Sequence, residues 1–86
     1  MELYKVLIKP SAVKEIKAIA TKKDRQSIIQ KIKKLSSNPR PHGCQKLTGN
    51  NRYRIRQAQY RILYIIEDKQ LVVYVVKIGH RKDIYR

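Results

Sequence analysis

The sequence contains few acidic residues, a single cysteine and no large aromatic side chains other than tyrosine. Among 86 residues, 6 Asp and Glu stand against 21 Lys and Arg, which gives a formal net charge of +15. Phe and Trp are absent, and Gly and Pro number three each. The lone Cys44 excludes an internal disulfide, and so few Gly and Pro exclude a collagen-like or linker-like chain. We therefore expect a cytoplasmic protein.

Long hydrophobic runs are also missing. No apolar run approaches the roughly 20 residues of a membrane-spanning helix, and residues 1–10 lack a signal-peptide core, so no membrane partner is expected. The hydrophobic fraction of 42% is nevertheless typical of globular proteins. The length predicts one domain, residues 1–86, with a thin core.

The basic excess is spread along the whole chain. Residues 1–43 carry 11 basic and 3 acidic side chains, and residues 44–86 carry 10 and 3. The charge therefore belongs to the whole surface and not to a tail. Such a surface favours a polyanionic partner, although the helix lysines are explained nearly as well by a solvated helix face.

Hydrophobic spacing predicts a strand and two helices in the first half. Residues 3–9 alternate as a strand does, with one face formed by Tyr4, Val6 and Ile8. Pro10 ends the strand, and Ser11 is expected to cap a helix that extends to Ala20. A capping-box pattern at 21–24 predicts a second helix with the apolar stripe Ile28, Ile29, Ile32 and Leu35. Residues 36–43 have the composition of a loop.

Three strands are predicted in the second half. Residues 52–57 alternate between arginine and apolar residues, while 60–67 and 71–78 are rich in Ile, Val, Leu and Tyr. The short connections at 58–59 and 68–69 predict two hairpins. The element order predicts an α+β fold: a small, mostly antiparallel four-stranded sheet with two N-terminal helices packed on one face (β-α-α-β-β-β).

The first hairpin predicts that arginines from different strands meet. A two-residue loop places Arg56 opposite Arg61, with Arg54 further along the same face. Like charges directly opposite each other cost stability, so the pair indicates an anion site. The second hairpin, with a two-residue loop, pairs Arg61 with Val76 and Ile66 with Leu71. It brings the chain end to the same region, where four further side chains are expected to converge: His80, Arg81, Tyr85 and Arg86.

Guanidinium groups are suited to phosphate chemistry. Their planar fork of donors matches phosphate oxygens and neutralises charge that builds up in a transition state. A nearby Tyr or His can transfer protons, and surrounding cations favour the phenolate. The residues His42, Cys44 and His80 lack the spacing of metal ligands. The expected chemistry, if the site is catalytic, is RNA cleavage by the 2′-OH without a metal or cofactor.

Three segments of the chain resemble the RelE toxin family, within the RelE/ParE superfamily of bacterial and archaeal toxin–antitoxin systems. They are the loop NPRPHG at 38–43 followed by KLTG, the core YRIR at 53–56 followed by YRILY, and the end IGHRKDIYR at 78–86. The resemblance implies a toxin that enters the ribosomal A site and cuts mRNA there. It also implies a cognate antitoxin that wraps and neutralises the toxin.

The resemblance also implies a role for each candidate residue. Arg54 and Arg56 match two phosphate-holding positions at which the best-studied members carry lysine, and Arg61 matches the arginine that supports the scissile phosphate. Arg81 matches the residue proposed to protonate the leaving group, and Tyr85 the one proposed to activate the 2′-OH. His80 lies where several relatives carry a catalytic histidine. Two further cations, Lys46 and Arg86, are expected to contact RNA.

Two other functions are compatible with the same residues. A ParE-like toxin shares the fold and inhibits DNA gyrase without cutting RNA, but chains of that branch generally lack the set Arg61, Arg81 and Tyr85. A plain RNA-binding module would use the same cations to hold phosphate without cleavage, with Tyr85 as a packing aromatic.

Overall fold

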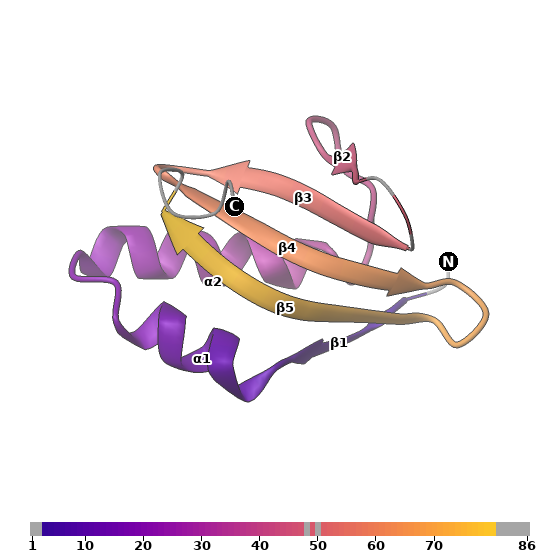
Figure 1. The fold of residues 1–86 in the computed structure, drawn as a ribbon, viewed down its shortest axis with the longest axis horizontal. Coiled ribbons are helices and arrows are strands. Elements are labelled where there is room, and N and C mark those ends of the chain that lie inside the picture. The colour runs from indigo at the N-terminus through magenta and orange to yellow at the C-terminus, as the bar shows by residue number, and fades with distance from the viewer. Residues whose placement is uncertain (1–2, 48, 50, 81–86) are drawn as a thin grey trace.

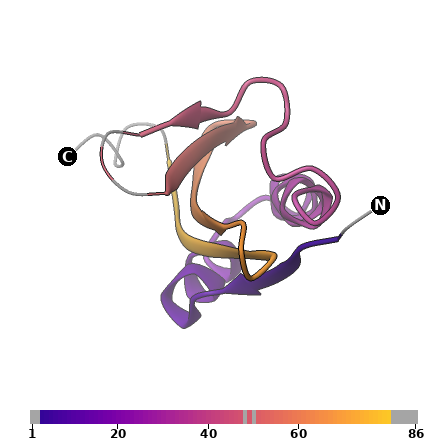
Figure 2. The same cartoon turned by 90° about the vertical axis from the view of Figure 1, so that its right-hand side faces the viewer.

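The computed structural model describes residues 3–47, 49 and 51–80. They form one five-stranded sheet with two helices on one of its faces (Figures 1 and 2). The elements are β1 (Lys5–Ile8), α1 (Pro10–Lys17), α2 (Lys22–Lys34), β2 (Gln45–Lys46), β3 (Arg52–Gln57), β4 (Tyr60–Glu67) and β5 (Val72–His80). No helix in this part of the chain is long and apolar enough to cross a membrane.

The sheet has the order β1-β5-β4-β3-β2, and only the β1–β5 pair is parallel. The predicted α+β class and its mostly antiparallel sheet are confirmed, but the number of strands was underestimated. The strand that was missed, β2, has two residues, which is too short to produce a detectable alternation.

The core lies between the helices and the inner face of the sheet. Ile28, Ile32 and Leu35 of the predicted stripe are buried, but Ile29 is 39% exposed. They pack against the inward residues of the three long strands, which are Tyr53, Ile55, Ile62, Tyr64, Ile66, Val73, Val75 and Ile78. The strand alternation predicted for 52–57 is therefore confirmed.

The first helix begins and ends at other residues than predicted, and the second begins as predicted but lacks the expected side-chain cap. The residue before α1 is Lys9, and Pro10 rather than Ser11 opens the helix, because the fixed φ of proline suits the first helical position. This helix ends at Lys17, short of the predicted Ala20. Thr21 does precede α2, but its side chain makes no capping hydrogen bond.

The first hairpin has the predicted register, and the second does not. Arg56 pairs with Arg61, as a two-residue loop requires. Between β4 and β5 the turn takes four residues, 68–71, so Ile66 pairs with Val73 and not with Leu71. A β-bulge at Val76 adds one further residue to β5. The bulge lets Ile78 point into the core while Lys77 stays exposed.

Candidate nucleic-acid interface

Three arginines of β3 lie on the sheet face that the helices leave open. Tyr53 and Ile55 alternate with them and are buried on the helix side. Arg52 and Arg56 are exposed, and Arg54 is half-buried. Strand alternation alone therefore presents a row of guanidinium groups on one surface.

Arg61 extends this row onto β4. It is directly opposite Arg56, and directly opposed residues have Cβ atoms about 4.5–5.5 Å apart on the same face. Its side chain is only 3% exposed, and no other charged residue in the described part of the chain is so buried. Two adjacent cations repel each other, and burial removes the water that would screen them. An anion bound at this pair would relieve both costs.

Gln45 of β2 contacts this row and was not expected from the sequence. It pairs with Arg54, whose Nη2 donates a hydrogen bond to Gln45 Oε1. Lys46 pairs instead with Tyr53, so its side chain leaves β2 on the opposite face from Arg54. The structure thus does not bring Lys46 into the arginine row.

His80 also lies away from the arginines. It pairs with Tyr60, and the two rings meet edge to face with centroids 5.6 Å apart. Tyr60 packs against the core on the helix side, whereas Arg61, the next residue, points to the open face. The register thus places His80 on the other face of the sheet from Arg61, and its predicted role in the site stays a prediction. The other predicted members, Arg81, Tyr85 and Arg86, lie outside the described residues.

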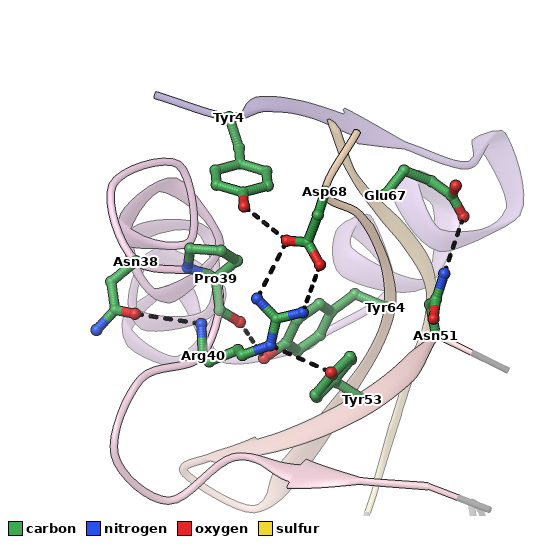
Figure 3. Close-up of polar contacts among 9 residues, drawn as sticks. All are labelled: Tyr4, Asn38, Pro39, Arg40, Asn51, Tyr53, Tyr64, Glu67 and Asp68. Atoms are coloured by element: carbon green, nitrogen blue, oxygen red, sulfur yellow. Dashed lines mark hydrogen bonds and ion pairs between the residues drawn. The ribbon is translucent and has the colours of Figure 1, made fainter. Parts of the chain in front are cut away.

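Arg40 forms a separate polar network at the other end of the sheet (Figure 3). Its Nη1 and Nη2 bind both carboxylate oxygens of Asp68 (3.2 and 2.8 Å), and its Nε donates to the Tyr53 hydroxyl (3.1 Å). The Tyr4 hydroxyl donates to Asp68 (2.7 Å). Tyr64 donates to the Pro39 carbonyl (2.8 Å). These bonds fasten the loop before β2 to the β4–β5 turn.

The network shifts the pKa values of its members. Hydrogen bonds from Arg40, and then from Tyr4, lower the pKa of Asp68 to about 2. The hydrogen bond to Asp68 raises the pKa of Tyr4. Burial is the main cause that raises the pKa of Tyr64 well above its ordinary value. These phenols are therefore held protonated, as donors within a structural network.

Residues 6–85 match a family described as the ParE toxin of type II toxin–antitoxin systems. The chain therefore belongs to this toxin family, within the RelE/ParE superfamily. No curated protein matches the sequence.

Solved RelE structures are similar to this chain over nearly its whole length. One is the RelE of an archaeal RelE–RelB complex from Pyrococcus horikoshii, with 25% identity and a TM-score of 0.84, covering 94% of this chain and 98% of the other. Another is the isolated E. coli RelE toxin, with 26% identity and a TM-score of 0.76, covering 95% and 90%. A YoeB/ParE toxin from Agrobacterium tumefaciens shares the fold at 15% identity and a TM-score of 0.75, covering 90% and 98%.

Proposed function

We propose that this toxin is a ribosome-dependent endoribonuclease that cuts mRNA in the A site without a metal. The observation that carries the proposal is the Arg56–Arg61 pair, with Arg54 beside it on the same face of the sheet. Arginines at directly opposed positions, one of them buried, are suited to hold a phosphodiester. The similarity to RelE structures supports the same reading.

In this proposal each residue acts on one atom group of the RNA. Arg54 and Arg56 hold flanking phosphates, and Arg61 stabilises the charge on the nonbridging oxygens of the scissile phosphate. Tyr85 accepts the proton of the 2′-OH, whose oxygen attacks the phosphorus. The bond to the 5′-oxygen breaks, and that oxygen takes a proton from Arg81, leaving a 2′,3′-cyclic phosphate. His80 receives no proton-transfer step, because its ring is on the other face.

The proposed partners follow from the same chemistry. The ribosome and its mRNA are polyanions that match a chain of net charge +15, and Lys46 and Arg86 would add RNA contacts. An antitoxin would supply acidic and apolar surface, and the similar archaeal RelE is found in complex with RelB. A ribosome-bound toxin acts in the cytoplasm.

The test is cleavage of a defined mRNA on programmed ribosomes, with cuts mapped by primer extension. The wild-type chain should cut within the translated frame, and Arg81→Ala and Tyr85→Phe should abolish cutting while ribosome binding persists. Full activity of both variants would remove these residues from the mechanism.

Inhibition of DNA gyrase is the second candidate function. It is favoured by the match to the ParE family over residues 6–85. A supercoiling assay with purified gyrase decides between the two. Loss of supercoiling with intact mRNA would select the ParE-like function.

A further inference from the structure

A small polar pocket lies between α2 and the end of β3. Its volume is about 110 Å³, and it is lined by Ser27, Gln30, Lys31, Lys34 and Gln57. The first four residues share one face of α2, because positions three and four apart are neighbours on a helix, and Gln57 is the last residue of β3. These five residues define the α2 pocket. A water molecule takes about 30 Å³ of liquid, so the pocket has room for a hydrated ionic group.

The α2 pocket is lined by cations and amide donors. Lys31 is half-buried and Lys34 is exposed. Among residues 3–47, 49 and 51–80, no carboxylate forms an ion pair with either lysine. Like charges at neighbouring positions of a helix are unfavourable, so this pair of lysines is stabilised by a bound anion. The side-chain amides of Gln30 and Gln57 add donors that carry no charge. The lining is therefore suited to an anion with several acceptor oxygens.

The α2 pocket and the arginine row lie on opposite faces of the sheet at the same end of β3. Gln57 is directly opposite Tyr60, which packs on the helix side, whereas the preceding residue, Arg56, is opposite Arg61 on the open face. Toward the hairpin, β2 pairs with β3 no further than Arg54. β2 therefore does not separate the two faces here, and one polyanionic chain that passes around this edge of β3 can contact both.

We propose that the α2 pocket binds a phosphate group of the same RNA chain that the arginine row holds on the open face. The proposal rests on the proposed function, which makes RNA the ligand. Lys31 and Lys34 neutralise the charge of this phosphate. The amides of Gln30 and Gln57 donate to its oxygens. Lysine is a point charge without the planar fork of arginine, so this contact adds affinity and sets the path of the chain, and the chemical step stays with Arg61.

The test is binding to ribosomes programmed with an mRNA that carries a 2′-deoxy nucleotide at the cut site, because this mRNA lacks the attacking hydroxyl. The double variant Lys31→Ala/Lys34→Ala should weaken binding about tenfold and reduce the slope of log affinity against log salt by about one. The matched control, Lys22→Ala/Lys33→Ala, removes the same charge from α2 outside the pocket and should leave the slope close to wild type. Equal effects of the two double variants would overturn the proposal.

Two further measurements separate a phosphate contact from general attraction. Gln57→Leu removes a donor but no charge, so binding should weaken about threefold at every salt concentration with the slope unchanged. With a cleavable mRNA, Lys31→Ala/Lys34→Ala should raise KM about tenfold and leave kcat unchanged, because the lost contact is made equally to the substrate and to the transition state. Wild-type affinity of Gln57→Leu, or a fall in kcat with KM unchanged, would contradict the proposal. If the alanine pair does not fold, Lys31→Gln/Lys34→Gln replaces it.

The two proposals also fail in different ways. A wild-type chain that leaves mRNA uncut removes the proposed function, and the α2 pocket is then tested on the free chain with a short oligouridylate as the probe. The NMR signals of the Gln57 side-chain amide should shift during this titration. The shift should be lost in Lys31→Ala/Lys34→Ala and kept in Lys22→Ala/Lys33→Ala. An amide signal that does not move in the wild-type chain would refute the pocket as an RNA contact.

Discussion

The two ends of the sheet use the same side chain in opposite ways. At the β4–β5 turn, the Arg40 guanidinium binds a carboxylate and a phenol and lies over the Tyr53 ring, 5.2 Å from its centroid. At the β3–β4 hairpin, Arg61 is buried and lies directly opposite a second arginine, Arg56. The first arrangement gives a guanidinium a carboxylate partner, and the second places two like charges at directly opposed positions.

This contrast separates structural from functional arginines. A chain with six acidic residues cannot give each of 21 cations a carboxylate. The carboxylate of Asp68 serves Arg40, which fastens a loop to the sheet. Arg61, which is buried directly opposite a second arginine, is the residue to which the proposed function assigns the phosphate.

Substitution of the two arginines should give opposite results. Arg61→Ala should lower kcat for mRNA cleavage by about 100-fold or more, because a charge-stabilising donor is lost, while the melting temperature stays equal or rises. Arg40→Ala should lower the melting temperature and leave cleavage by the folded protein intact. Thermal unfolding and cleavage assays on both variants test the contrast.

Arg61→Lys is the control for charge alone. It keeps the cation but loses the planar fork, so partial activity is expected. A large loss of stability in Arg61→Ala, or of cleavage in Arg40→Ala, would contradict the assignment of a structural role to Arg40 and a functional role to Arg61.

The β3 arginines nearest the β3–β4 hairpin should dominate the response of ribosome binding to salt. Arg54→Ala and Arg56→Ala should each reduce the slope of log affinity against log salt by about one phosphate contact, as measured by ribosome binding at several ionic strengths. Arg52→Ala is the matched control, because it lies on the same face near the other end of β3 and should change the slope less. Equal effects of all three substitutions would indicate that ribosome binding depends on the overall positive charge and not on a localised phosphate site.

The polar network around Arg40 can be tested by removing one oxygen atom, the Tyr64 hydroxyl. Tyr64→Phe removes the donor to the Pro39 carbonyl and should lower the free energy of unfolding by about 1 kcal/mol. Cleavage should not change. Chemical denaturation measures the effect, and Tyr74→Phe on the open face of β5 is the control. A loss of cleavage without a loss of stability would indicate that Tyr64 contributes to RNA cleavage and not to the fold.

The smallest expected effect is on the dependence of the melting temperature on pH. The pKa of Asp68 is lowered from its ordinary value near 4 to about 2 in the folded chain. Its contribution to stability is therefore present above pH 4 and is lost as the pH falls from about 4 to about 2. Asp68→Asn should flatten the dependence of melting temperature on pH in this window. An unchanged profile would mean that the Arg40–Asp68 pair adds nothing in solution.

Local patterns in the sequence were sufficient for one hairpin and insufficient for the other. The β3–β4 register followed from strict alternation and a two-residue connection, so the Arg56–Arg61 contact could be predicted. The β4–β5 connection was uncertain in length, and a bulge leaves no mark in a run of Val residues. The predicted pairing of Arg61 with Val76 was therefore three residues from the observed pairing with Gly79, and β5 continues to His80, where the chain was expected to leave the sheet.

Long-range polar contacts could not be predicted from patterns in the sequence. Arg40 and Asp68 are 28 residues apart, and their pairing depends on how the loop before β2 folds back over the sheet. Gln45 was missed for a related reason, since two residues are too few to identify an edge strand. The burial of Arg61 also lies outside such patterns, because alternation predicts direction but not depth.

The extra residue at Val76 determines what stands next to the buried guanidinium. Without the bulge, the register set by the turn would continue, and the aliphatic side chain of Ile78 would lie opposite Arg61. With Val76 inserted, Gly79, which has no side chain, takes this position. The one inserted residue in β5 thus determines that a glycine, and not an isoleucine, lies opposite Arg61.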